Sequence, residues 1–285
     1  MCGLTKRILA VACALLLAAA EAGAQSAPPA FDHAHRAWSA LLARHVALQE
    51  GGHASRVRYA DFAKDRAALK AYLATLSQVG EVEFRGWTRA QRLAFLANAY
   101  NAFAVEKVLS RYPDLRSIWD FGRVFGNPFK DRFFSLLGRR ASLDDIEHEM
   151  LRKPGAYDDV RVHVALNCAS IGCPMLRAEA YMADRLDAQL EDQMRRFLSD
   201  RTRNRLSPQG GRLEVSKIFD WFKEDWERGT RNFDDRAAPI RSPSQYLARY
   251  ADLLSEDPAG RARIAAGEAP IDFLDYDWTL NDAGR

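Results

Sequence analysis

The spacing of apolar residues predicts helices over most of the first half of the chain. Apolar positions recur every three or four residues over 38–48 and again over 62–76, the period of a helix with one buried face. Between them, RVRYADF alternates apolar and charged residues and predicts a short strand or an extended link. Thr88 is a good N-cap for a third helix, which ends before Pro113.

The second half mixes helix, strand and loop patterns. Residues 117–135 are rich in Phe, Gly and Asn and predict an irregular loop. Ser142 caps SLDDIEHEMLRKPG, where Asp145 can complete a capping box and Pro154-Gly155 ends the helix. VRVHVALN, residues 160–167, has four apolar residues on one face and is the strongest strand prediction.

A further helix is predicted over Arg185–Leu198 and a strand in RLEVSKIF, followed by the Trp- and Phe-rich WFKEDW. The tail, APIDFLDYDWTLNDA, is extended and aromatic. There is no internal repeat and no clear linker over residues 31–285. The fold class that follows is α+β: one helix-rich domain with a small antiparallel sheet.

The N-terminus has the pattern of a signal peptide. Basic Lys6 and Arg7 precede an apolar run over 8–20, and Ala22-Gly23-Ala24 matches the small-x-small cleavage pattern. The run is too short to span a bilayer comfortably. We therefore expect residues 1–24 to be removed, leaving a periplasmic or secreted protein with no stable membrane insertion.

Charge and composition narrow the partners. The net charge is +3, and no long basic run carries interleaved aromatic residues, so nucleic acid is not expected as a partner. The sequence predicts no cofactor. The expected partner is a peptide or small-molecule substrate.

Cys168 and Cys173 are the two cysteines that remain after cleavage. In an oxidising compartment, a disulfide is the first interpretation of such a pair. Zinc would need His148 or His163 as further ligands, and C-x4-C is not a usual zinc spacing. The third interpretation is that one cysteine is a thiolate nucleophile near the predicted start of a helix. The backbone N–H groups there would lower the thiol pKa and form an oxyanion hole. Residue types alone leave all three open.

Two histidines are candidate general bases. Asp144 and His148 lie one helical turn apart, with Glu147 beside them, and a carboxylate that orients an imidazole is typical of general-base catalysis. An ordinary solvated ion pair is the alternative. His163 faces away from the valines of its predicted strand, towards a cleft or a neighbouring carbonyl.

Asn98 and Asn101 interrupt an otherwise apolar helix. Buried asparagine is costly unless it is hydrogen-bonded. The pair therefore either fixes a loop, which is the favoured interpretation, or binds a substrate amide or carboxylate.

Several of these stretches together resemble the DUF547 family. The similarity runs over about 93–226, and the closing YDWTLN is similar to bacterial members. The motifs, in chain order, are FLANAYNAFAVEKVL, SLDDIEHEMLR, VHVALNCASIGCPMLRAEAY and VSKIFDWFKEDW.

The resemblance favours Cys168 over Cys173 as a nucleophile, because plant relatives have Ser or Asp at the second position. A cysteine, a histidine and an acid imply, by analogy, a papain-like or transglutaminase-like core. In those enzymes the cysteine usually precedes the histidine. Here His148 and His163 come first, so the core would be permuted or convergent.

The resulting hypothesis is a cysteine-dependent hydrolase or acyl-transfer enzyme acting on amide bonds. Cys168 attacks, His148 or His163 takes its proton, and Glu147 or Asp144 orients the base. The residues expected to position the substrate are Asn98, Asn101, Asp144, Asn167 and Arg177. The alternative is a non-catalytic exported binding module with a structural Cys168–Cys173 disulfide.

Overall fold

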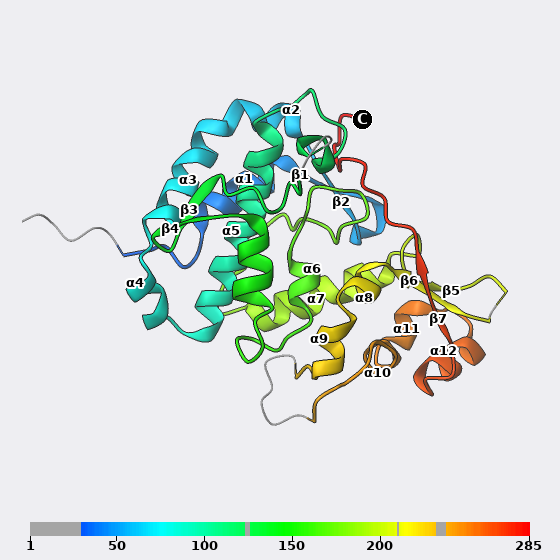
Figure 1. Cartoon of the computed structure of the whole chain (residues 1–285). Helices are drawn as coiled ribbons and strands as arrows, with labels where there is room; N and C mark the ends of the chain where they lie inside the picture. The colour runs from blue at the N-terminus through cyan, green and yellow to red at the C-terminus, as the bar shows by residue number, and fades with distance from the viewer. Residues whose placement is uncertain (1–29, 123–125, 210, 232–237) are drawn as a thin grey trace, which may run out of the picture. The chain divides into compact units, whose positions relative to one another are not determined.

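The computed structural model describes residues 30–122, 126–209, 211–231 and 238–285 of the chain. Residues Asp32–Arg285 form one compact unit that is rich in helices (Figure 1). The predicted signal peptide, residues 1–24, lies outside the described residues. None of the described helices combines the length and the apolar character that crossing a membrane requires.

Helix α5, Arg89–Leu109, is a long helix that is buried over most of its length. Its start confirms the predicted cap, because Gln91 N donates to the Thr88 hydroxyl at 3.2 Å and Thr88 N donates to the Gln91 side chain at 2.9 Å. Every residue over 93–105 is buried. A helix buried on all sides must satisfy its polar side chains inside the protein.

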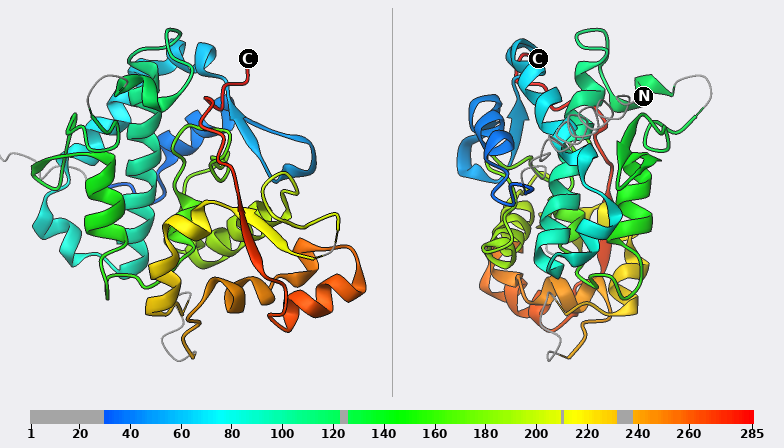
Figure 2. Two further views of the ribbon diagram at one scale, coloured as in Figure 1. Left: turned by 45° about the vertical axis from the view of Figure 1, so that its right-hand side comes forward. Right: turned by 90° about the vertical axis from the view of Figure 1, so that its left-hand side faces the viewer.

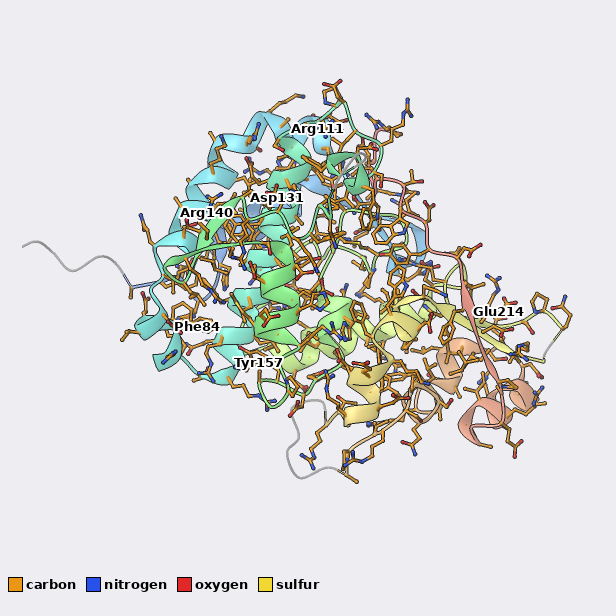
Figure 3. All side chains as sticks on the ribbon, viewed as in Figure 1. Phe84, Arg111, Asp131, Arg140, Tyr157 and Glu214 are labelled. Atoms are coloured by element: carbon orange, nitrogen blue, oxygen red, sulfur yellow. A yellow bond between two sulfur atoms is a disulfide. The ribbon has the colours of Figure 1, made fainter. Side chains whose placement is uncertain are left out.

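Shorter helices pack around α5. Ring contact between Phe84, labelled in Figure 3, and Phe95 at 5.6 Å holds α4 against α5. The first predicted helix stops early, since Leu48 lies in a strand. The helices before α5 are α1 (Arg36–His45), α2 (Tyr59–Phe62), α3 (Arg66–Gln78) and α4 (Glu81–Gly86).

The strands form three small sheets, which fits the predicted α+β class. β1 (Val46–Leu48) pairs antiparallel with β2 (Ser55–Val57), and β3 (Phe134–Leu136) pairs antiparallel with β4 (Arg139–Ala141). The third sheet has the order β5-β6-β7, in which β5–β6 is antiparallel and β6–β7 is parallel. Its strands are β5 (Arg205–Leu206), β6 (Leu213–Ser216) and β7 (Ile271–Leu274).

The second half of the unit has its own apolar core around Phe197, Trp226 and Tyr246, all of them buried. The predicted helix after Arg185 is confirmed as α7 (Leu186–Ser199). The remaining helices are α8 (Ile218–Trp221), α9 (Lys223–Arg228), α10 (Pro243–Ala248), α11 (Ala251–Leu254) and α12 (Pro258–Ala265).

Two predictions of local structure need correction. The predicted strand over 160–167 is wrong, because Val162–Ala165 forms the short helix α6. Residues 160–167 are all buried, so the alternation of valines with other residues does not mark a solvent face. The predicted irregular loop over 117–135 contains a 3-10 helix, η3 (Ile118–Phe121), and the first residues of β3.

Candidate functional site

Cys168 and Cys173 form a disulfide just beyond α6. The loop between them turns at Ala169, which has a φ of +63° and donates its N–H to the Asn167 side chain at 3.0 Å. Asn167 also donates to Pro174 O at 2.8 Å and so closes the loop from its other end. Of the three alternatives for the cysteines, the structure contains the disulfide. Within the described ranges, no group of three or more His, Cys, Asp or Glu side chains is placed to hold a metal.

Two asparagines of α5 hold the segments on either side of this loop. Asn101 Nδ2 donates to Ala165 O at 2.9 Å, and Asn101 Oδ1 accepts from Asn167 N at 2.8 Å. Asn98 makes the same pair of bonds to the backbone of Tyr181, at 2.8 and 3.0 Å. These contacts favour the structural interpretation of both side chains over substrate binding.

The C-terminal segment closes over the disulfide loop (Figure 2). Beyond β7, Thr279 O accepts a hydrogen bond from Ile171 N, and Asp277 O accepts one from Gly172 N, both at 2.8 Å. It then reaches β2, where Val57 N donates to the carbonyl of residue 281 at 2.8 Å. A Cβ on Gly172 would lie 2.9 Å from the Tyr276 ring and 3.0 Å from the backbone of Asp277. Glycine is therefore required for this close approach.

Replacing Gly172 with alanine should lower the free energy of unfolding by about 1–3 kcal/mol, because backbone of the C-terminal segment has to move. Urea denaturation measures the change. The control is Gly86→Ala, since nothing lies within 4 Å of a Cβ added there. Equal stability of Gly172→Ala and the unchanged protein would show that the segment is not tightly held.

A pocket of about 330 Å³ lies against the disulfide. It brings together six predicted site residues: Asp144, Glu147, His148, His163, Cys168 and Cys173. Seven aromatic side chains also line it: Tyr100, Trp119, Phe129, Trp221, Phe222, Tyr276 and Trp278. The pocket lining is thus largely aromatic and includes a few polar groups.

Glu147 and His148 reach the pocket from a helix that is wider than predicted. Its start has the predicted capping box, in which Asp145 N donates to Ser142 Oγ at 3.0 Å and Ser142 N donates to Asp145 Oδ2 at 2.9 Å. From Asp145 to Leu151 the backbone forms a π-helix, η4, and Arg152 N donates to Glu147 O at 2.9 Å. π-Helical turns are rare and concentrate at functional sites.

Burial raises the pKa of Glu147 to about 7, although the residue as a whole is only half-buried. The Asp144 and Asp225 charges raise it further, while Arg152 and a hydrogen bond from the Tyr100 hydroxyl oppose the rise. A carboxyl group that changes its charge near neutral pH is typical of sites that bind ligands or move protons.

His148 is held between two charged neighbours. A guanidinium nitrogen of Arg152 hydrogen-bonds its Nδ1, and its Nε2 lies 3.6 Å from Asp144 Oδ1. Burial, followed by the Arg152 charge, lowers the pKa of His148. The predicted i,i+4 pair of His148 with Asp144 is therefore present, but as a long contact. Glu147, the other acid predicted to orient His148, hydrogen-bonds Tyr100.

His163 has a carboxylate partner that the sequence did not indicate. Its Nε2 lies 2.8 Å from Asp225 Oδ2, and its ring stacks on Phe222 at 4.1 Å. Its other ring nitrogen, Nδ1, is buried and has no hydrogen-bond partner among the described residues. Burial lowers the pKa of His163 despite Asp225, whereas hydrogen bonds from His163 and Arg152 hold the pKa of Asp225 well below its usual range.

The sulfur atoms contact hydroxyl groups. Tyr276 Oη lies 3.1 Å from Cys173 Sγ and 3.2 Å from Cys168 Sγ, and Ser170 Oγ lies 3.2 Å from Cys168 Sγ. Among the described hydrogen bonds, none joins either sulfur to His148 or His163. The predicted Cys168–His148 contact is thus absent from the disulfide-bonded state.

Arg177 and the asparagines lie outside the described pocket lining. The Arg177 guanidinium pairs with Asp192 at 2.6 Å and with Glu179 at 2.8 Å, and these contacts fix the chain after the disulfide loop. Of the predicted substrate-binding residues, Asp144 alone lines the described pocket.

Sequence reasoning missed Asp225 and the aromatic walls. Asp225 lies within WFKEDW, a stretch noted only for its apolar residues, and Tyr276 and Trp278 lie within YDWTLN. In both stretches the aromatic residues were visible, but their partners are distant along the chain: His163 lies 62 positions from Asp225, and Cys173 lies 103 positions from Tyr276. Only the fold brings them together.

The fold and the pocket define an α+β protein with a disulfide-walled aromatic site. The model of the family described as "Protein of unknown function, DUF547" matches residues 84–198. Residues 84–198, which contain the first three of the four motifs, therefore match the DUF547 family, as the resemblance of these motifs predicted. Comparisons with curated proteins and with solved structures give no match.

Proposed function

We propose that the chain is an exported binding protein, periplasmic or secreted, whose pocket holds a small organic ligand. One observation supports this most directly: both sulfurs of a disulfide line the same pocket as seven aromatic side chains. A thiolate, not a disulfide sulfur, is the nucleophile of cysteine enzymes. Apolar, aromatic walls with few polar groups are typical of small-molecule sites. The predicted signal peptide supports export.

Thiol chemistry tests this proposal. The exported chain, purified without reductant, should show no free thiol in its folded or denatured form, and its mass should be lower by about two hydrogen atoms than after reduction. It should also release no burst of p-nitrophenol from p-nitrophenyl acetate. Two free thiols, together with a burst that Cys168→Ala abolishes, would contradict the binding proposal.

A cysteine hydrolase that is active only when reduced is the second candidate. The observation in its favour is His163, which lines the same pocket as Cys168 and is oriented by Asp225. Its Nδ1 has no partner within the described part of the chain. A dithiol would supply two electrons and two protons to the sulfurs. The Cys168 thiolate would then attack an amide carbonyl carbon, the C–N bond would break, and His163 would pass the thiol proton to the leaving amine. Water would hydrolyse the thioester.

In this second scheme, His163–Asp225 replaces the predicted His148–Glu147 pair. Asp225→Asn in reduced protein should lower the acylation rate by about 100-fold or more and alter its pH profile, because the imidazole loses its orienting charge. Stopped-flow release of p-nitrophenol measures the rate. The same rate in Asp225→Asn and unchanged protein would rule out the dyad as the base.

A further inference from the structure

We propose that the ligand of this pocket is an organic cation, bound through an alkylammonium head group. The inference rests on the proposed binding function and names the chemical class that the pocket takes. It is carried by two features together, the arrangement of the aromatic rings and the sign of the charges beside them.

Trp278 is the centre of the aromatic wall. Its ring lies 4.6 Å from Tyr276, 5.3 Å from Trp119 and 5.7 Å from Trp221. These rings come from the C-terminal segment, η3 and α8, so three separate parts of the chain supply them. The faces of aromatic rings carry negative potential and attract cations, most strongly in tryptophan.

Part of this wall is open to solvent. Trp119 is 36% exposed and Trp221 is 43% exposed, which is high for large apolar side chains beside a pocket. Exposed aromatic groups that surround a pocket mark a binding surface more often than a packing fault. A ligand that covers them would remove this apolar surface from water.

The charges that line the pocket are negative. Asp144 and Glu147 are the acidic residues of the described lining, and this part of the lining contains no lysine or arginine. His148 and His163, also in the lining, both have lowered pKa values and so are neutral near pH 7. A cation in this pocket therefore has both aromatic rings and carboxyl groups in its lining.

Arg152, the guanidinium next to His148, is already paired. It lies 2.6 Å from Asp225 and stacks over Phe222, with its central carbon 4.5 Å from the ring centre. Asp225 largely neutralises the charge of Arg152, and Arg152 is not part of the described lining. Arg152 acts on Glu147 only at a distance, since the described ion pairs include none of Glu147, and a bound cation would supply a closer positive charge.

A neutral sugar is the competing ligand, because pyranose rings also stack on tryptophan. A sugar has many hydroxyl groups to satisfy, whereas most of the described lining is apolar. It would also leave the carboxyl groups without a counter-charge in a desolvated site. The volume of about 330 Å³ suits a compact head group with a short chain.

The test compares choline with 3,3-dimethylbutan-1-ol, its uncharged carbon isostere, by isothermal titration calorimetry on the disulfide-bonded protein. Choline should bind at least about 10-fold more tightly, since shape is matched and only charge differs. Trp278→Leu and Asp144→Asn should each weaken choline binding by about 10-fold. Glu149→Gln should leave it unchanged, because Glu149 is exposed on η4 and does not line the described pocket. Circular dichroism confirms that each variant is folded.

Three results would overturn the inference. Equal binding of the alcohol would show an apolar site, and binding of methyl β-glucoside without choline would show a sugar site; both leave the binding function intact. No choline binding at all would refute the cation directly. A Cys168-dependent acyl burst would instead refute the proposed binding function, whichever probe binds.

Discussion

Replacing Glu147 with glutamine should make the protein more stable at about pH 8 and leave its stability unchanged at about pH 4. The folded-state pKa of Glu147 is raised to about 7, above the ordinary value of 4.5. Below both values the carboxyl group is protonated in the folded and the unfolded chain, so the variant gains nothing. As the pH rises from about 4.5 to about 7, the carboxyl group ionises more readily in the unfolded chain, which lowers the free energy of unfolding. Above about pH 7 this loss of stability is complete. Glutamine does not ionise, so the variant does not lose this stability.

The gain should be about 2 kcal/mol, which is less than the full shift implies because the residue is half-buried. Urea denaturation across this pH range measures it, with Glu149→Gln as the control on the same helix. A gain that does not depend on pH would show that the charge of Glu147 is not its cause. A side chain that lowers stability at neutral pH is typical of a site kept for function.

Replacing Asn101 with alanine should lower the free energy of unfolding by about 3–5 kcal/mol, the largest effect that we expect of a single substitution. The change removes two hydrogen bonds and leaves Ala165 O and Asn167 N buried without partners. Each unsatisfied backbone group costs about 1–3 kcal/mol. Urea denaturation at neutral pH measures the loss.

Asn98→Ala offers an independent repeat, since Asn98 makes the same two bonds to Tyr181. The control is Gln78→Ala, at an exposed position at the end of α3, where we expect a change within about 0.5 kcal/mol. A loss below about 1 kcal/mol for Asn101→Ala would mean that water replaces the amide.

The features that sequence predicted correctly are local. The Thr88 and Ser142 caps depend on residues three positions apart, and both form as expected. Asn98 and Asn101 stood out because the helix around them is apolar, and the favoured structural role agrees with their contacts.

What the sequence could not predict depends on distant neighbours. VRVHVALN has the alternation of a strand, but the segment is buried on all sides and its backbone is bonded by Asn101, so a short helix forms. The widening of η4 at Glu147 has no signature in residue spacing. The Asp225 partner of His163 and the Tyr276 contact with the sulfurs each join parts of the chain that only the complete fold brings together.

The hydrogen bonds between the C-terminal segment and the disulfide loop imply an order in which the walls of the pocket form. The disulfide joins cysteines five positions apart, so it can form as soon as α6 and the following turn have reached an oxidising compartment. The part of the wall that includes Tyr276 and Trp278 lies about a hundred residues further along the chain, and the same segment is bonded to β2 from residue 283 to Val57 O at 2.9 Å. The pocket wall can therefore be complete only after residues 276–278 have been made, later than the disulfide loop.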